Sequence, residues 1–588
     1  MNEQSTVPAG MSRRHVLAGI GGAGAALATG GVAAPAGAHP GAAGHAAYHH
    51  AHAMNPHDFC RMFDGMKPFA EPTDRIKAAL LEVGQAGGIM DAHDDLAAGA
   101  KALIVDPTVN GNPTADNPYG TNPDNPTMTA GSTFVGQFTD HDITFDQTSK
   151  LGVPQDPANS PNTRTPRLDL DSVFGGGPGR RPDLYEPNGD GSVGPRLRIG
   201  SGGVHEDVPR VAQSDGSYGA LLGDPRNDEN LIVAGLHCGH ILFYNRVLDE
   251  LDQHAAIAAF PAARQARAET GPVLSGAGDH GRFLMARQVT QWHYQWLLVH
   301  EHLPQIVGQH LVDRVLARQR FYRPTTDRAA MPIEFGGAAY RFGHSMVRPS
   351  YRANFSSGTG DSADPAKDPF FALVFDTAEP DFSGPVTTDR SDLLGGFPAP
   401  RRYIGWQTFF DTGDGSVRNN KKIDTTISSV LFTLPMPAIA PHTQLAPLVL
   451  PQRNLLRQLT WGLPSGQALA ERMGVESLTR DDLADIAGLH RSFGRSTPLW
   501  YYVLAEARAA TGGLHLGPVG GRIVAETLIG LLRADPTSYL SAMPHFRPFL
   551  GTDFAMGPAP MTTVTGDRSY TRAHFLHYAG VLDAGVYR

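Results

Sequence analysis

Residues 136–146 read GQFTDHDITFD and place His141 between two carboxylates. If this stretch is helical, Gln137 and His141 share one face, because residues four apart lie one turn apart. Asp140 and Asp142 then leave the helix to either side of that face. Polar side chains that leave one helix in three directions can each contribute to a separate site. Taken alone, the window is equally typical of a solvated, Asp-rich helix start, and it lacks the glycine and terminal glutamate of an EF-hand calcium loop.

A second oxygen-rich stretch, TPRLDLDSVFG, follows at residues 165–175. It offers the hydroxyl of Thr165, the carboxylates of Asp169 and Asp171, and the backbone carbonyls between them. Calcium takes about six to eight oxygen ligands from a segment of this kind. The alternative is a short strand that ends in the turn at residues 175–178.

Residues 340–347, YRFGHSMV, predict a short amphipathic helix that carries one histidine, His344. A single histidine on an apolar face is more often a hydrogen-bonded core residue than a metal ligand. This segment therefore needs companions elsewhere in the chain before it indicates a site.

Apolar residues recur at helical spacing over residues 230–252 and 281–300. Strand-like alternation is scarce, so we expect a mainly α-helical fold with long loops, at residues 106–130, 175–203 and 350–400. We expect further helices at residues 74–104, 255–267, 308–319, 453–460, 465–473, 479–488, 497–510 and 516–533.

The N-terminus reads as an export signal. Arg13 and Arg14 precede a small, apolar run at residues 18–36, and residues 36–38 offer a small-x-small cleavage site. The run is poor in leucine, so a membrane-spanning helix is not expected there. We interpret residues 1–38 as a twin-arginine-type signal peptide, which predicts a secreted, periplasmic or cell-envelope protein without an integral membrane segment after signal removal.

The next segment, residues 39–57, is rich in alanine and histidine. Tracts of this kind can bind metal, but without an ordered fold to fix the ligands we expect a flexible segment. Its histidines are His39, His45, His49, His50, His52 and His57.

Composition limits the remaining possibilities. A chain of 588 residues suggests several domains, yet no low-complexity linker separates two halves, so we expect residues 58–588 to form one domain. The net charge of -9 is spread along the chain without a basic run, which argues against a nucleic-acid partner. The only cysteines, Cys60 and Cys238, make no disulfide framework, and the oligomeric state is left open.

Taken in order, these stretches resemble the animal-type haem peroxidases of the peroxidase–cyclooxygenase superfamily, in an exported form of bacterial type. First come GQFTDHD and a calcium loop that ends in DSVFG. Arg-x-x-Glu follows at residues 226–229, before a helix that ends in Asn-Arg. The last two are Arg-Phe-Gly-His at 341–344 and Asn454 before Gly-Leu-Pro at 462–464. The resemblance covers roughly residues 58–540 and implies a single, mainly α-helical domain with haem b buried between central helices.

The resemblance implies a role for each matching residue. His141 corresponds to the distal base that moves a proton between the peroxide oxygens, Arg226 to the distal cation, and Gln137 to the residue that borders the peroxide and halide position. His344 corresponds to the proximal ligand of the haem iron. Asn454 corresponds to its hydrogen-bond partner.

The resemblance also implies a calcium site and cofactor links. Its calcium ligands would be Asp142, Thr165, Arg167 through its carbonyl, Asp169, and Asp171, where the family often has serine. Asp140 and Glu229 match the carboxylates that form ester bonds to haem in the mammalian enzymes. Two departures are that Asn230 stands where a methionine would form a third link, and that residues 459–461 replace Arg-Asp-His, although Arg457 is retained.

The implied activity is that of a haem peroxidase, which reduces hydrogen peroxide and oxidises a small organic donor or a halide. The alternatives are a fatty-acid dioxygenase of the same superfamily, or a non-catalytic secreted adhesion or matrix protein that keeps the fold. Dioxygenases need a radical-carrying tyrosine three residues before the proximal histidine. That position is Arg341, which we place among the residues that border the cofactor, and Tyr340 lies one residue away. On a helix this is about 100° of rotation, which predicts a phenol aimed away from the channel over the haem.

Overall fold

The computed structural model describes residues 59–203, 205–212, 218–354, 369–376, 389–435, 446–557 and 566–582. They all belong to one compact unit, Met54–Arg588. The predicted signal peptide and the predicted flexible segment at residues 39–57 lie outside the described residues.

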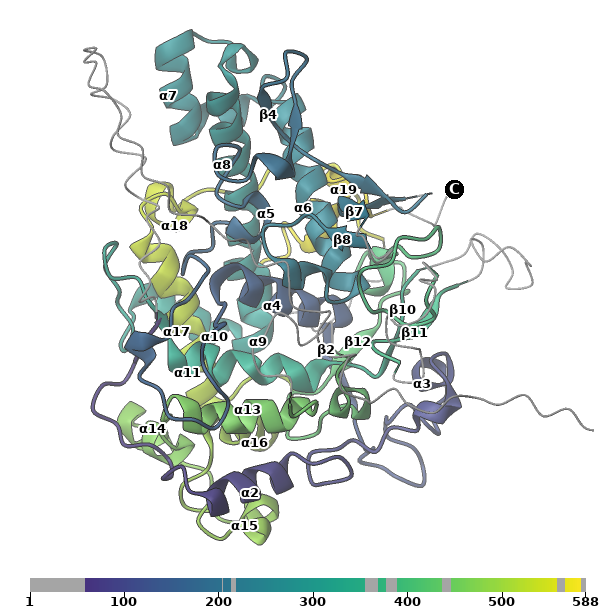
Figure 1. Ribbon diagram of the computed structural model, residues 1–588, viewed down its shortest axis with the longest axis vertical. Helices are drawn as coiled ribbons and strands as arrows, with labels where there is room; N and C mark the ends of the chain where they lie inside the picture. Colours follow the sequence, from purple (N-terminus) through teal and green to yellow (C-terminus); the bar gives the residue numbers. More distant parts are fainter. Residues whose placement is uncertain are drawn as a thin grey trace, which may run out of the picture. The chain divides into compact units, whose positions relative to one another are not determined.

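Helices dominate and make up 43% of the described residues, which confirms the expected mainly α-helical class (Figure 1). The described α-helices are α2 (Asp74–Val83), α3 (Ala102–Val105), α4 (Ala130–Ile143), α5 (Asp171–Phe174), α6 (Leu231–Asp249), α7 (Pro261–Thr270), α8 (Asp279–Leu297), α9 (Leu303–Val307), α10 (Gln309–Ala317), α11 (Ile333–Gly336), α13 (Leu450–Thr460), α14 (Gly466–Met473), α15 (Ala484–Leu489), α16 (Leu499–Thr511), α17 (Pro518–Ala534), α18 (Tyr539–Ala542) and α19 (Arg572–Tyr578).

The described strands are short and pair only two at a time. One pair is parallel, β1 (Phe59–Cys60) with β9 (Met331–Pro332). The antiparallel pairs are β2 (Asp124–Thr129) with β12 (Asn419–Lys421), β3 (Tyr185–Pro187) with β4 (Val193–Leu197), β5 (Gly200–Ser201) with β6 (Glu206–Asp207), β7 (Arg210–Ala212) with β8 (Tyr218–Ala220), and β10 (Ser350–Arg352) with β11 (Phe371–Leu373). None of them forms an extended sheet, so the core is built between helices.

Helix α4, which carries the GQFTDHD stretch, is the most deeply embedded element of the site. It packs against α6 and against η9 (Ala339–Met346), a short 3₁₀ helix. Its first turn needs a glycine, because a Cβ on Gly131 would lie 2.4 Å from the ring of Phe410 and 2.7 Å from the carbonyl oxygen of Phe409. Asp142 and Thr139 of α4 are fully buried. Each polar side chain on this helix therefore needs a partner inside the protein.

The start of α6 fixes the segment that precedes it. The side chain of Asn230 caps the helix by accepting hydrogen bonds from the backbone N–H of Ile232 at 3.1 Å and Val233 at 3.0 Å. A cap of this kind stabilises a helix by about 1 kcal/mol. Just before it, the side chain of Asp224 accepts from the backbone N–H of Arg226 and starts the turn η5 (Pro225–Asp228). Residues 226–229 are thus held rigidly beside α4.

The segment around His344 is held by α13 and α16. Trp500 Nε1 donates to the carbonyl of Arg341 at 3.1 Å, and Gln458 Nε2 donates to the carbonyl of Gly337 at 3.2 Å. A Cβ on Gly337 would lie 2.6 Å from the carbonyl oxygen of Ile333, so only glycine allows this close turn. The helix at 340–347 is thus present, as a 3₁₀ helix.

Four expectations about elements are wrong. The loop expected at residues 106–130 contains β2, which pairs with β12. The predicted helix at 74–104 ends at Val83, because the glycine-rich run from Gly84 to Gly88 costs helix stability and Gly87 adopts a positive φ of 70°. The predicted loops at 175–203 and 350–400 contain the hairpin β3–β4 and the pair β10–β11.

In the described part of the chain, one helix, α6, is long and apolar enough by composition to cross a membrane. In its most apolar window 83% of the residues are buried inside the protein, as in a core helix.

Candidate functional site

One cavity lies between α4, the turn η5, η9 and α13, and encloses about 1370 Å³ between atoms, with the space open to solvent included. All of the predicted catalytic and cofactor-binding residues line it: Gln137, Asp140, His141, Arg226, Glu229, Arg341, His344 and Asn454. The rest of its wall is largely apolar, with Phe134, Phe342, Val374, Phe375, Leu431 and Leu434. Side chains separated by hundreds of residues in sequence thus converge on one concave, mostly apolar space, the usual form of a ligand site.

The ring of His141 is fixed by a hydrogen bond on the side away from the cavity. Its Nδ1 lies 2.9 Å from Oδ1 of Asn227, whose Nδ2 lies 3.0 Å from Nδ1 of His237. Because Oδ1 only accepts, Nδ1 of His141 carries the hydrogen and Nε2 keeps its lone pair. Burial, and then the charge of Arg226, lower the pKa of His141 to about 4. The residue is therefore a neutral base at neutral pH.

Arg226 ties the turn η5 to the end of α4. Its Nη2 donates to the carbonyl oxygens of His141 at 3.1 Å and Thr144 at 2.6 Å, and the guanidinium pairs with Asp224 at 2.8 Å. The guanidinium carbon lies 4.0 Å from the centre of the Phe145 ring. A cation at the carbonyl end of a helix is favourable, so this contact holds Arg226 at the cavity wall close to His141.

Gln137 is held from both sides by groups that follow Arg226. Its Nε2 donates to Glu229 at 3.2 Å, and its Oε1 accepts from Nδ2 of Asn230 at 3.1 Å. Burial raises the pKa of Glu229 to about 7, against the opposing effect of the Arg226 charge. The other carboxylate, Asp140, accepts from the hydroxyl of Thr144 at 2.9 Å. Both carboxylates line the cavity.

On the opposite wall, Nδ1 of His344 lies 2.7 Å from Nδ2 of Asn454. The Oδ1 of Asn454 accepts from Arg341 at 3.5 Å, and Arg341 also donates to the carbonyl of Gly336 at 2.9 Å. Burial, and then the Arg341 charge, lower the pKa of His344 to about 3, so the imidazole is neutral. A ligand that uses Nε2 must carry its hydrogen on Nδ1, so metal binding requires the amide of Asn454 to present Oδ1 to His344.

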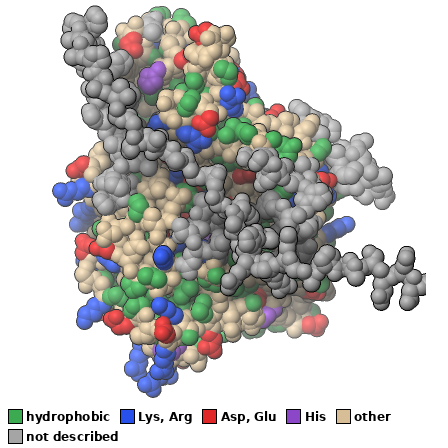
Figure 2. All heavy atoms as spheres, viewed as in Figure 1, with side chains coloured by type: hydrophobic (Ala, Val, Ile, Leu, Met, Phe, Trp, Pro, Cys, Tyr) green, Lys and Arg blue, Asp and Glu red, His purple; other side chains and the backbone are tan. Residues whose placement is uncertain are grey.

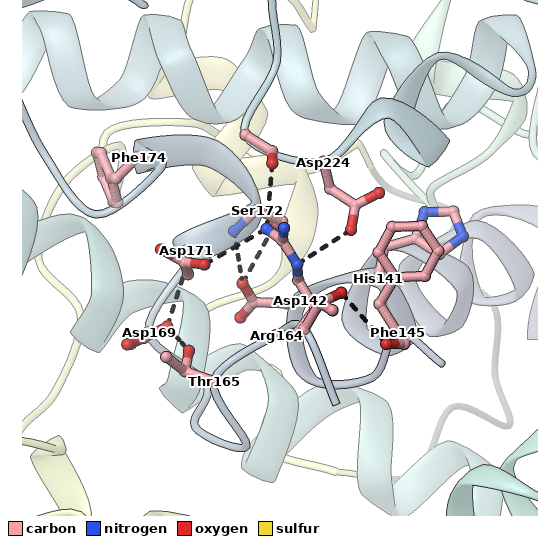
Figure 3. A network of polar contacts seen from close by, with 12 residues as sticks. His141, Asp142, Phe145, Arg164, Thr165, Asp169, Asp171, Ser172, Phe174 and Asp224 are labelled. Carbon is pink, nitrogen blue, oxygen red and sulfur yellow. Dashed lines mark hydrogen bonds and ion pairs between the residues drawn. The ribbon is translucent and has the colours of Figure 1, made fainter. Parts of the chain in front are cut away.

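The predicted calcium residues form a separate network behind His141 (Figure 3). Both oxygens of Asp142 accept hydrogen bonds: Oδ2 from the N–H of Leu170 at 3.1 Å, and Oδ1 from the hydroxyl of Ser172 at 3.1 Å. Leu170 takes the left-handed conformation, φ 57°, to aim its N–H at that carboxylate. In this network Asp142 fastens the 165–175 loop to α4, one residue away from His141.

The remaining predicted calcium residues lie in the loop itself. The hydroxyl of Thr165 donates to Asp169 at 2.9 Å, and Asp171 pairs with Arg164 at 3.3 Å. Arg167, which lies between Thr165 and Asp169 in the sequence, is half-buried. Burial, and then the neighbouring Asp171, raise the pKa of Asp169 to about 6. Across the described ranges, no group of three or more His, Cys, Asp or Glu side chains is arranged to hold a metal ion. The calcium site therefore stays a prediction.

Tyr340 lies in the wall of the cavity, where its ring stacks on Phe335 with ring centroids 4.4 Å apart. Its hydroxyl lies 3.5 Å from Nε2 of His302, a residue that does not line this cavity. The expectation that the phenol is aimed away from the channel therefore stays a prediction.

Two functional candidates escaped the sequence reasoning, Asn227 and His237. The asparagine directly follows Arg226 and the histidine lies on an apolar helix. The sequence indicates them only as two polar residues. Their link to His141 depends on how α6 packs on α4, which the sequence does not show. Arg457, expected near the cofactor, lines the cavity and pairs with Asp146 at 2.7 Å.

Comparisons with known proteins agree with this geometry. The family model for animal haem peroxidase matches residues 149–374, which include Arg226 and His344. No curated protein matches the chain significantly in sequence.

Among solved structures, Peroxidase A from Dictyostelium discoideum is similar, with 16% identity and a TM-score of 0.51 over 86% of this chain and 96% of that one. Lower similarity is found to a variant of the fatty acid alpha-dioxygenase of Oryza sativa with palmitic acid, at 13% identity and TM-score 0.48 over 78% and 73% of the two chains. The fatty acid alpha-dioxygenase of Arabidopsis thaliana has 15% identity and a TM-score of 0.45 over 78% of this chain and 70% of that one.

At these identities the solved structures bear on the fold alone. The family model, in contrast, spans the turn that carries Arg226 and the segment that carries His344, while α4 with His141 and α13 with Asn454 lie outside the matched range. Residues 149–374 of the chain are thus similar to the animal haem peroxidases.

Proposed function

We propose that the protein is a haem-dependent peroxidase that reduces hydrogen peroxide and oxidises a small organic donor or a halide. The observation that carries the proposal is the position of His141. Its Nδ1 is bound by Asn227, its Nε2 is the free base, and it lines the same cavity as His344 on the opposite wall.

The cavity fits the cofactor that the family binds. Two neutral histidines approach it from opposite walls, and Phe342, Phe375 and Leu431 supply the apolar surface that a flat macrocycle needs. His344 would be the iron ligand, with Asn454 as its hydrogen-bond partner, while Arg341 and Arg457 offer cations at the wall. When bound, haem supplies the redox chemistry.

The chain's own residues then act on the peroxide. Nε2 of His141 accepts a proton from one peroxide oxygen and returns it to the other, which leaves as water. The cationic Arg226 favours negative charge that develops on the departing oxygen. Gln137, fixed between Glu229 and Asn230, offers a rigid polar group at the place where peroxide or halide binds.

Three finer features belong to the same proposal. Asp140 and Glu229 would be the residues that link haem through ester bonds, since both carboxylates line the cavity. A calcium ion joins Asp142 to the loop of Thr165, Arg167, Asp169 and Asp171, where it would neutralise the concentrated acidic charge. The protein is exported through its twin-arginine signal and acts outside the cytoplasm.

A specific observation favours a second candidate, a fatty-acid dioxygenase. Tyr340 lies in the cavity wall, one residue before the position that a radical-carrying tyrosine takes in the dioxygenases. The two candidates differ in their substrate, so incubation with palmitic acid and oxygen separates them. A purely structural adhesion protein is disfavoured, because such a protein has no physical need for both His141 and His344.

The deciding experiment is a peroxide titration of the purified protein followed at the Soret band. A peroxidase shows a stoichiometric spectral change that a small donor such as guaiacol reverses. His141→Ala keeps the starting spectrum and loses the rapid change. If the haem-loaded protein leaves hydrogen peroxide unreduced and oxidises palmitic acid instead, the proposal is overturned in favour of the dioxygenase.

A further inference from the structure

A hollow lined by arginine lies on the outside of the helical core, where α10 packs against α17. It encloses about 950 Å³, with open solvent included, and is separate from the cavity of His141 and His344. Its lining consists of Ala317 and five arginines: Arg314, Arg318, Arg320, Arg323 and Arg522.

The charge in this hollow is not balanced by its own lining. A nearby carboxylate, Glu526, is fully buried and pairs with Arg522 at 3.2 Å. The same carboxylate also accepts the backbone N–H groups of Arg320 at 2.9 Å and Phe321 at 2.6 Å, so its charge is spent inside the protein. In the described ranges, Arg314 and Arg318 are exposed and have no acidic partner.

The cations gather at one end of α10. Arg314 lies in the last turn of the helix, and Arg318 follows directly after the helix ends at Ala317. Arg533 adds a further cation at the edge, where it donates to Gln319 at 3.3 Å. The whole chain carries 58 acidic and 49 basic residues, and on the face drawn in Figure 2 the two signs are interspersed. A hollow of one sign therefore stands out as a binding feature.

We propose that this arginine hollow binds a compact polyanion that carries two or three phosphate groups. Planar guanidinium groups match phosphate oxygens in pairs, and two arginines are enough for one phosphate. Five guanidinium groups around one hollow exceed that need, so the ligand has more than one phosphate. Arg522, with 7% of its surface exposed and its geometry set by Glu526, forms the fixed floor of the site. Arg314, Arg318, Arg320 and Arg323 are exposed around it.

Calorimetric titration of the full-length, haem-loaded protein with sodium tripolyphosphate tests the proposal. We expect one binding event that weakens as salt is raised, because phosphate contacts are screened. Arg314→Glu combined with Arg318→Glu should lower the affinity by about tenfold or more, since each bond to a charged group is worth at least that factor. The neutral pair Arg314→Gln and Arg318→Gln should give a smaller loss in the same direction.

The matched control is Arg264→Glu combined with Arg267→Glu on α7. Both side chains are exposed, and the pair changes the net charge by the same amount. An equal loss of affinity in this control would mean that only the overall charge matters, and would overturn the site. Peroxide reduction should be unchanged in all of these variants, which also reports that they fold.

Two further probes identify the source of the phosphate. Vesicles with phosphatidic acid that bind wild type and release the α10 variant support a lipid headgroup, whereas tripolyphosphate binding without vesicle binding supports a free oligophosphate. Failure of tripolyphosphate to bind, with retention of a 20-nucleotide single strand that depends on Arg314 and Arg318, would overturn the proposal in favour of nucleic acid.

Discussion

Asn227 bridges two buried histidines: its Oδ1 lies 2.9 Å from Nδ1 of His141, and its Nδ2 lies 3.0 Å from Nδ1 of His237. The side-chain amide of Asn227 therefore uses its oxygen as an acceptor and its nitrogen as a donor. It lies on the side of His141 that faces away from the cavity. An asparagine held at both ends fixes the tautomer of His141 as well as its direction. The orientation of His141 therefore depends on His237 of α6, through Asn227, which is not among the residues that line the cavity.

The first prediction concerns this bridge. Asn227→Leu removes the acceptor and leaves the ring of His141 free to rotate, so the second-order rate of reaction with hydrogen peroxide should fall about 10–100-fold, the usual cost of losing such a supporting partner. Asn227→Asp keeps an acceptor for His141 and should retain more of the rate. Stopped-flow mixing measures both. Equal rates for the leucine and aspartate variants would show that the hydrogen bond does not position His141.

The second prediction is the loss of His141 itself. His141→Ala should retain haem and slow the reaction with hydrogen peroxide by about 10²–10⁴-fold, the usual contribution of a positioned acid–base group. The matched control is His293→Ala, which removes a buried histidine of α8 whose Nδ1 lies 2.8 Å from the carbonyl oxygen of Val289 and which belongs to neither the base nor its bridge. If His141→Ala reacts at the wild-type rate, His141 has no part in peroxide reduction.

The pH dependence of the same rate is the third prediction. Burial and Arg226 lower the pKa of His141 to about 4, and only the neutral imidazole can accept a proton. The rate should therefore stay level from neutral pH down to about 5 and fall as the pH passes through about 4. The Soret spectrum, recorded at each pH, must stay constant over this range, because release of His344 would cause an unrelated loss. A midpoint near the ordinary histidine pKa of about 6.5 would contradict the buried, neutral base.

The sequence could predict which residues share a cavity. The GQFTDHD stretch, Arg226, His344 and Asn454 each sit in a short local pattern. The resemblance that these patterns carry in their order implied one common site, and all of them line one cavity. The helical periodicity likewise predicted α6 and α8, because a long apolar face leaves few alternatives.

Other features depend on packing that no local pattern records. The link from Asn227 to His237 needs a specific rotation of α6, and the position of Tyr340 depends on η9 being a 3₁₀ helix. The arginine hollow joins α10 to Arg522 of α17, about two hundred residues later in the chain. Pairings at that separation are set by the tertiary fold, so inspection of either segment alone cannot find them.

The fourth prediction concerns calcium. Asp142 directly follows His141 and binds the loop through Leu170 and Ser172, so an ion there would hold the catalytic helix in place. Metal analysis of the purified protein should find about one calcium per chain, and Asp169→Asn combined with Asp171→Asn should remove it and slow peroxide reduction. Protein free of calcium, with activity untouched by a chelator, would show that the hydrogen bonds of Asp142 alone fasten the loop.

The last prediction is covalent attachment of haem through Asp140 and Glu229. Both carboxylates line the cavity, one on α4 and one at the end of η5, so an ester at each would join the cofactor to the two elements that position His141 and Arg226. Glu229 is buried, its pKa is raised to about 7, and it accepts from Gln137, so removal of its charge by ester formation relieves the cost of burying it.

Attachment requires turnover, so acid–acetone extraction should release less haem after repeated additions of peroxide than before. Mass spectrometry should then locate the links on the peptides of Asp140 and Glu229. Asp140→Ala and Glu229→Ala should each lose one link, while Asp146→Ala, outside the cavity lining, should lose neither. Complete extraction of haem from the turned-over wild type would leave both carboxylates with a purely structural role, holding Thr144 and Gln137.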